Sequence, residues 1–225
     1  MGLDPANSPL YTGVVPGTIS PPILFGTQSI NSQTPTITTT DTNLLGSTVF
    51  VTLGRTASGS SVISVIDSVG SVYTRDRNDA TAPGAVFTRT SNAPSIPTGG
   101  TVTANFNNAG TMGMGVFYVT GLTPTSPLDT APANVSGAAA TSATTINSGT
   151  LAQANEILLA IVDFSANPGV VTPGAGWTLI FNTSGVSFLY TYYQIVDSTA
   201  SVAWAPTWVN SVNYKSGLLS YKGAF

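Results

Sequence analysis

The densest group of charged side chains in this sequence lies in SVYTRDRNDATAP (71–83). Arg75, Asp76, Arg77 and Asp79 fall there, although the whole chain has only six Lys and Arg and nine Asp and Glu. A catalytic group needs a perturbed environment, but alternating Arg and Asp side chains neutralise one another. Two interpretations remain, a solvated loop after a strand and a patch that orients one subunit against another.

Arg89 belongs to the second interpretation, because it follows shortly in AVFTRT (85–90). On a regular strand Arg75 and Arg77 would share one face and Asp76 would occupy the other. A guanidinium is well suited to bidentate pairing with a carboxylate of a partner. We therefore take Arg75, Asp76, Arg77, Asp79 and Arg89 as candidate interface residues.

The groups that catalysis and metal binding use most often are missing from this chain. It has no His and no Cys, which removes the usual general base and thiolate chemistry. Asp67 stands where a carboxylate caps the backbone of its own turn. The alternative for Asp67, Asp76 and Asp79 is a calcium site, since calcium takes oxygen ligands, but their spacing does not fit an EF-hand loop. We predict a non-enzymatic protein with no cofactor.

The glycine-rich stretch GTMGMG (110–115) is not followed by a lysine or by a helical pattern. A phosphate-binding loop requires both. The stretch therefore does not indicate a nucleotide site.

Aromatic residues crowd the C-terminal part of the chain and suggest a second class of function. Trp204 and Trp208 lie at the two ends of WAPTW, and Pro206 between them interrupts a strand ladder, which is typical of an edge or loop. With Tyr192 they are the candidates for an exposed platform that stacks on a sugar. The other interpretation is packing in the core, which we favour for Trp177.

The composition indicates a folded chain whose surface carries few charges. Charged residues make up 7% of the sequence, against about 25% in a typical soluble domain, while apolar residues make up 42%. A free monomer with so few charges is poorly protected against self-association. The net charge of −3 and the scarcity of Lys and Arg exclude a basic face for nucleic acid.

The secondary structure is predicted to be almost entirely strand. TVFVTL (48–53), TVTANF (101–106) and VSFLYTYYQI (186–195) alternate between apolar and polar residues with a period of two. MGVFYVT (114–120) and ILLAIVD (157–163) are continuously apolar, as expected of central strands.

A weak internal repeat has an offset near one hundred residues. The matches keep their order: NLLGSTVFVTLGRTASG (43–59) with NEILLAIVDFSANPG (155–169), VYTRD (72–76) with GWTLI (176–180), TVTANF (101–106) with SVAWAP (201–206), and VFYVTG (116–121) with LLSYKG (218–223). Each half alone is too small for a good core, so we expect the halves to share one sandwich.

The predicted fold is an all-β, jelly-roll-like β-sandwich built from two weakly repeated halves, with an extended N-terminal arm. We divide the chain into a Pro-rich arm with a lead-in strand (1–42), a first β half (43–122), a connector rich in Pro, Ser, Thr and Ala (123–150) and a second β half (151–225). The connector is expected to cross the surface and to contribute edge strands.

The N-terminal arm is dense in proline, with Pro5, Pro9 and Pro16 spaced through it. Proline at that density gives an extended segment rather than a helix. The arm is either a free terminus or a segment docked on its own domain or on a neighbour. We take Pro5, Pro9 and Pro16 as candidate interface residues.

The pattern of turns and core strands resembles a duplicated β-sandwich sequence type found in tailed-phage virion proteins and bacterial surface proteins. The stretches that carry the resemblance are SVIDSVGSVYT (64–74), GVFYVTGLTPTSPLD (115–129), ANEILLAIVDF (154–164), TPGAGWTLI (172–180) and YYQIVDSTASVAWAP (192–206). They are structural signatures, so the resemblance implies a fold and a setting and assigns no site residue.

Taken together, these observations predict a virion structural protein of a tailed bacteriophage. Within that class they favour a capsid decoration or cement protein or a minor head or tail component. Its partners would be copies of itself or other virion proteins, such as the major capsid protein. The alternative is a carbohydrate-binding or adhesive module of a bacterial surface or phage fibre protein.

The sequence also bears on location. The N-terminus lacks the features of a signal peptide, and no apolar run approaches the length of a membrane span. We expect no membrane and no nucleic acid as partner, and a virion assembled in the host cytoplasm. Under the alternative, the location would be an extracellular surface.

Overall fold

The computed structural model describes residues 17–55, 61–77 and 84–224, the last range without side chains at 84–87. Within these ranges the regular structure consists of antiparallel strands, and no helix occurs. The sheets pack face to face, so the predicted all-β sandwich is confirmed.

The first half contains eight strands in two sheets. The strands are β1 (Ile23–Ser32), β2 (Thr36–Thr38), β3 (Thr48–Arg55), β4 (Val62–Asp67), β5 (Thr74–Arg77), β6 (Gly84–Thr90), β7 (Thr101–Phe106) and β8 (Gly110–Val119). The large sheet has the order β1-β8-β3-β6-β5, and the small sheet has the order β2-β7-β4.

The second half contains the remaining eight strands. They are β9 (Val135–Ser142), β10 (Ile146–Asn147), β11 (Asn155–Phe164), β12 (Val171–Thr172), β13 (Thr178–Asn182), β14 (Phe188–Asp197), β15 (Ala203–Trp204) and β16 (Thr207–Lys222). β16 pairs with β9, β11 and β12, β11 pairs with β14, and β14 pairs with β13. β10 and β15 form a separate two-stranded sheet.

The two halves repeat one strand order. The path β1-β8-β3-β6-β5 of the first half corresponds to β9-β16-β11-β14-β13 of the second, and the β2–β7 pair corresponds to β10–β15. Pairing of the first strand with the eighth and the third with the sixth is the order of a jelly roll. The repeated stretches of sequence lie on corresponding strands, for example VYTRD at β5 and GWTLI at β13.

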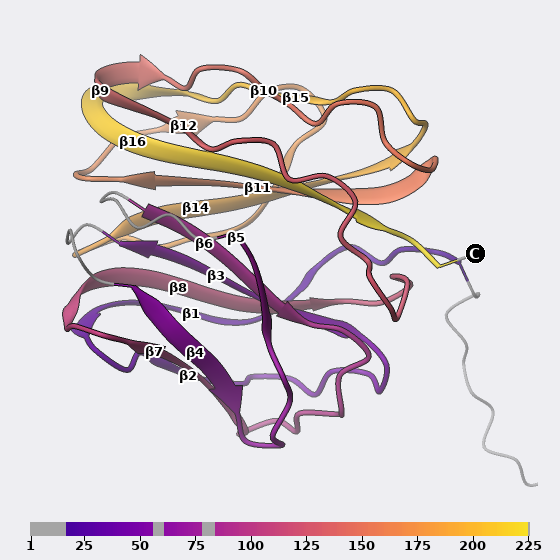
Figure 1. Cartoon of the computed structure of the whole chain (residues 1–225). Coiled ribbons are helices and arrows are strands. Elements are labelled where there is room, and N and C mark those ends of the chain that lie inside the picture. The colour runs from indigo at the N-terminus through magenta and orange to yellow at the C-terminus, as the bar shows by residue number, and fades with distance from the viewer. Residues whose placement is uncertain (1–16, 56–60, 78–83, 225) are drawn as a thin grey trace, which may run out of the picture.

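The halves do not share one sandwich as we expected. The described residues form three buried apolar clusters: one within the first half, one within the second half and one between the two large sheets. Figure 1 shows the resulting stack, in which β2, β4 and β7 lie at one end, the two large sheets lie in the middle and β10 and β15 lie at the other end. The chain therefore forms two β-sandwiches joined face to face.

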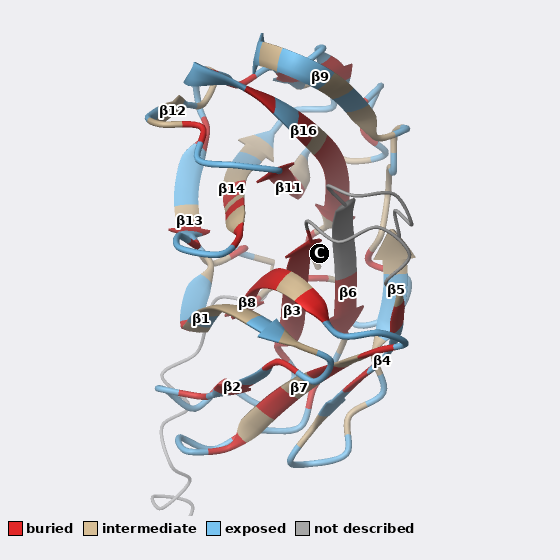
Figure 2. Cartoon of the chain, turned by 90° about the vertical axis from the view of Figure 1, so that its left-hand side faces the viewer, coloured by how far each residue is buried: buried red, intermediate tan, exposed pale blue. Residues whose placement is uncertain are grey.

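This stacking explains why some strands are buried on both faces, including β3, whose TVFVTL pattern predicted one polar face. β3 is buried at every residue, and β11 is buried at every residue after Asn155, because each has a core on both faces. β7 covers only one core, so Val102, Ala104 and Phe106 are buried and the residues between them are partly exposed. Burial is accordingly concentrated in the middle of the molecule (Figure 2).

Glycines allow the two large sheets to approach closely. A Cβ atom at Gly54 would overlap the Asp163 carboxylate, and a Cβ atom at Gly115 would overlap the Phe181 ring. Gly113 and Gly115 belong to the GTMGMG stretch, which therefore serves packing between the halves.

The two ends of the described chain lie close together, because both bond to Asn155. Asn155 donates from Nδ2 to the Gly17 carbonyl at 2.5 Å, and Gly223 donates its N–H to the Asn155 carbonyl at 2.8 Å. β9 and β10 lie inside the stretch that we had assigned to a connector, and they pair with β16 and β15. By strand order the second half thus begins at β9, because Ala- and Ser-rich segments can serve as edge strands without an apolar pattern.

Candidate functional site

The charged stretch forms a buried cluster at the boundary between the two halves. The Asp76 carboxylate lies 2.7 Å from Arg89 Nε, and the two side chains are only 2% and 10% exposed. Tyr221 of β16 donates its hydroxyl to Asp76 Oδ2 at 3.0 Å. An ion pair from the first half therefore satisfies a buried hydroxyl from the second.

A β-bulge in β5 directs these side chains toward the second half. Arg75 pairs with Thr88 and Arg77 with Phe87, which leaves Asp76 as the additional residue. Arg77 donates from its guanidinium to the Pro132 carbonyl in the segment that leads to β9. The alternation that we expected of a regular strand does not apply here, because the bulge lets Asp76 reach Tyr221 while Arg77 reaches the segment before β9.

Aromatic packing surrounds the ion pair. The Arg89 guanidinium lies 6.0 Å from the centroid of the Tyr221 ring, and that ring packs edge-on against Phe50 at 4.9 Å. Burial raises the pKa of Asp76 above its ordinary value, and Arg89 and Tyr221 act against that rise without cancelling it. Burial and the Asp76 charge raise the pKa of Tyr221, so its hydroxyl remains a donor.

The predicted interface patch is therefore largely an internal cluster. Asp76 and Arg89 neutralise one another inside the molecule and are not available to a partner, which corrects our assignment of these two residues. Arg77 binds the chain's own backbone. Arg75 is exposed. Asp79, Pro5, Pro9 and Pro16 lie outside the described residues.

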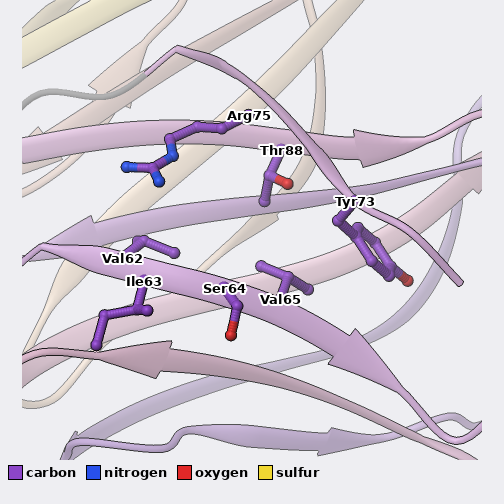
Figure 3. Close-up of a pocket in the computed structure, with 7 residues that line it drawn as sticks. All are labelled: Val62, Ile63, Ser64, Val65, Tyr73, Arg75 and Thr88. Atoms are coloured by element: carbon purple, nitrogen blue, oxygen red, sulfur yellow. The ribbon is translucent and has the colours of Figure 1, made fainter. Parts of the chain in front are cut away.

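Arg75 lies at a small pocket between the edge strands β4 and β5. The pocket has a volume of about 50 Å³ and is lined by Val62, Ile63, Ser64, Val65, Tyr73, Arg75 and Thr88. Figure 3 shows Arg75 and Tyr73 at opposite ends, with Thr88 between them and β4 running past all three. The pocket opens where β5 joins the large sheet and leaves β4 as the edge of the small one.

Asp67 holds one wall of this pocket. Its Oδ1 accepts the N–H groups of Val69 at 3.0 Å and Ser71 at 2.9 Å, and its Oδ2 accepts the Tyr73 hydroxyl at 3.0 Å. The predicted turn role of Asp67 is confirmed. Burial and the Asp67 charge raise the pKa of Tyr73, so the hydroxyl stays protonated and the ring stays fixed.

The aromatic residues that we had considered for sugar binding are buried. Trp204, Trp208 and Tyr192 are 0%, 5% and 2% exposed. Trp204 donates its indole N–H to Ser216 Oγ and Trp208 to the Ala140 carbonyl, each at 2.7 Å. The assignment of these three residues to a sugar platform was wrong, because all three side chains pack in the buried apolar cluster of the second half.

A pair of carboxyl groups escaped the sequence analysis. Glu156 is fully buried at the start of β11, and its carboxyl shares a hydrogen bond with Asp129. Burial, followed by the Asp129 charge, raises the pKa of Glu156 to about 7. Asp129 in turn accepts the Ala152 N–H at 3.0 Å. The available signal was a lone acid at the head of the apolar run EILLAIVDF (156–164).

Within the described ranges, no group of three or more His, Cys, Asp or Glu is placed to hold a metal ion. No helix there is long and apolar enough to cross a membrane.

Comparison of the chain with models of protein families, with curated proteins and with solved structures returns no match. The functional argument therefore depends on this chain's own residues.

Proposed function

We propose that this chain is a non-enzymatic structural protein of a virion, acting through contacts between subunits as a capsid decoration or cement protein or a minor head or tail component of a tailed bacteriophage. Its partners would be copies of itself or neighbouring virion proteins. Its work would be mechanical, since apolar area buried at many modest contacts adds up across a lattice.

The observation that carries the proposal is the very low charge of the surface. The chain has fifteen charged residues in 225, from six Lys and Arg and nine Asp and Glu. Arg55, Arg89, Glu156 and Asp163 are buried and contribute nothing to the surface. Charge repulsion keeps free proteins apart in solution, so a surface this poor in charge suits a protein that works in contact with others.

The architecture is compatible with this setting. Two sandwiches are joined through a third core, and the pocket at β4 has a volume of only about 50 Å³. Jelly rolls are common in viral capsid proteins, but they also occur in lectins, so the fold supports the proposal only by analogy.

The sugar-binding alternative has lost its candidate residues. All three tryptophans are at most 7% exposed and donate their indole N–H groups to protein acceptors. No described residue now favours this alternative over the virion proposal.

The test is to purify particles on a density gradient from lysed cultures that carry the gene and to probe the fractions with an antibody against this chain. We expect the chain to band with the particles, and immunogold microscopy to place it on their surface. A host cytoplasmic enzyme serves as the control for trapped protein. Recovery of the chain only in the soluble or host-envelope fractions would contradict the proposal.

A further inference from the structure

The pocket between β4 and β5 has the size of one proline ring. A water-sized group occupies about 10–15 Å³ on the scale used for such cavities, so 50 Å³ holds roughly three to five atoms. The ring of proline adds three side-chain carbons to the backbone. Aromatic-lined grooves are a recurrent binding site for extended proline-containing segments, and Tyr73 supplies the aromatic wall here.

The pocket is formed before any partner arrives. The Tyr73 ring is held by its hydroxyl at Asp67, and Asp67 is held by two backbone N–H groups of its own turn. Preorganisation of this kind removes an entropy cost from binding. Beside the pocket, β4 is the edge strand of its sheet.

Exposed apolar side chains flank the pocket. Ile63 is 61% exposed, Ile66 on the same strand is 52% exposed, and Val72, next to Tyr73, is 83% exposed. An extended segment lying along β4 would cover part of this apolar area, which contributes free energy in proportion to the area removed from water.

Arg75 adds a cation at one end of the pocket. It is exposed, and in the described part of the chain no carboxylate forms an ion pair with it. An occupant that places a carboxylate beside a proline would match both the charge and the shape of this site.

The first sixteen residues of the chain contain such a pair. In MGLDPANSPLYTGVVP, Asp4 is the only charged side chain and is followed directly by Pro5. In an extended proline-type conformation these residues span up to about 50 Å at about 3.1 Å per residue, which is ample to reach a neighbouring molecule.

We propose that the pocket binds Asp4 and Pro5 of a second copy of this chain, with the Pro5 ring against Tyr73 and the Asp4 carboxylate on Arg75. The inference rests on the proposed function, because a link from the arm of one copy to the edge of the next is how copies would be joined. It further defines the partner as the chain itself.

Single cysteines test the contact directly, because the chain has no Cys of its own. Leu3→Cys protein, with its cysteine next to Asp4 at the Arg75 end of the pocket, is mixed with Ile63→Cys protein, oxidised gently and run on a non-reducing gel. We expect a cross-linked pair of two chains. The matched control replaces Ile63→Cys with Val209→Cys, whose side chain is 67% exposed in the second half, and should give no pair above background. Equal cross-linking in both mixtures would overturn the proposal.

Charge reversal tests the recognition. Arg75→Asp and Asp4→Arg should each lower the yield of the cross-linked pair about tenfold, and the two changes together should restore it. Asp197→Arg, an exposed acid of the second half, is the control and should leave the yield unchanged. Single charge reversals that leave the yield unchanged would overturn the proposal. So would a chain carrying both cysteines that forms the disulfide only within itself, because the proposed contact joins two copies.

These results are independent of the particle fractionation. A chain that bands with particles but shows no arm contact leaves the virion proposal standing and removes this one. An arm contact in a chain that is absent from particles would support this inference and contradict the virion proposal.

Discussion

At the scale of single residues, this protein buries several of its few charges. Asp76 and Arg89 neutralise each other beside Tyr221 at the boundary between the halves. A buried pair of this kind contributes little compared with apolar residues of the same shape, but loss of one member leaves the other uncompensated. Removal of one member of the pair should therefore lower the free energy of unfolding more than replacement of both.

We expect Arg89→Met to lower the free energy of unfolding by about 3–5 kcal/mol, because Asp76 is then buried without its cation. The double variant Asp76→Asn with Arg89→Met should lose about 1–2 kcal/mol, since the amide carbonyl still accepts the Tyr221 hydroxyl. Urea denaturation of both variants measures the difference. Arg75→Met, at an exposed position, is the control and should change stability by less than about 0.5 kcal/mol. Additive losses at positions 76 and 89 would contradict the coupling.

Glu156 should make stability depend on pH. Its pKa is about 7 in the folded chain against an ordinary value of 4.5, so the folded state binds the proton more tightly. This contribution is complete below pH 4.5 and is lost as the pH rises through about 7, a fall on the order of 3 kcal/mol. Glu156→Gln should remove the fall, because an amide does not titrate. Thermal unfolding of both proteins from pH 4 to pH 8 measures it, and parallel profiles would contradict the prediction.

At the scale of elements, the central strands are shaped by having cores on both faces. β3, β8 and β11 are buried along nearly their whole length, and glycines at Gly54, Gly113 and Gly115 remove side chains where the opposite sheet comes close. The contact between the halves also includes polar pairs, and the hydroxyls of Thr52 and Thr191, for example, lie 3.0 Å apart. The two sheets therefore interlock through specific residues.

Gly115→Ala should destabilise the protein by about 1–3 kcal/mol, because the new methyl group overlaps the Phe181 ring across the boundary. Gly174→Ala is the matched control, since its Cβ would meet only ordinary contact with Trp177 at 3.7 Å. Chemical denaturation compares the two variants. A stable Gly115→Ala protein would show that the sheets separate easily.

At the scale of the whole molecule, a third core joins the two sandwiches, and we expect them to behave as one cooperative unit. The cluster between the halves includes Phe50 and Phe117 from the first half and Leu159 and Leu219 from the second, all fully buried. Either half alone would expose this face to water. Separation of the halves is therefore costly, and they should unfold together.

Tryptophan fluorescence can test this coupling, because Trp177, Trp204 and Trp208 all lie in the second half. Phe50→Ala, in the first half, should lower stability by about 3–5 kcal/mol and shift the midpoint of the tryptophan signal together with that of the far-UV circular dichroism. Val72→Ala, at an 83% exposed position, is the control. A tryptophan midpoint unchanged by Phe50→Ala would mean that the halves unfold separately.

Much of the fold could be predicted because local patterns of apolar and polar residues specify the strands. The period-two alternation of TVTANF specifies a strand with one buried face, and the apolar run of ILLAIVD specifies a strand with two. The turn at Asp67 was predictable for the same reason, since its carboxylate bonds to residues within six positions of it. The virion assignment and the sugar-binding alternative stay predictions.

The candidate site depended more on tertiary contacts. Exposure of Trp204 and Trp208 was predicted from a proline between them. It was wrong because both rings pack in the core of the second half, where Trp208 donates to the Ala140 carbonyl 68 residues earlier. The pairing of Asp76 with Arg89 needed the bulge in β5, and the Glu156 and Asp129 pair joins residues 27 positions apart. No local sequence pattern predicts contacts between residues so far apart in the chain.

The sequence by itself determined the class of secondary structure, the duplication and the low charge, because hydrophobic periodicity and composition act locally or as sums over the chain. Only the tertiary structure decided that the halves are two sandwiches with a shared third core, which charges are buried and where the pocket at Arg75 lies. Those features arise from residues distant in sequence, and their positions follow from how whole sheets pack.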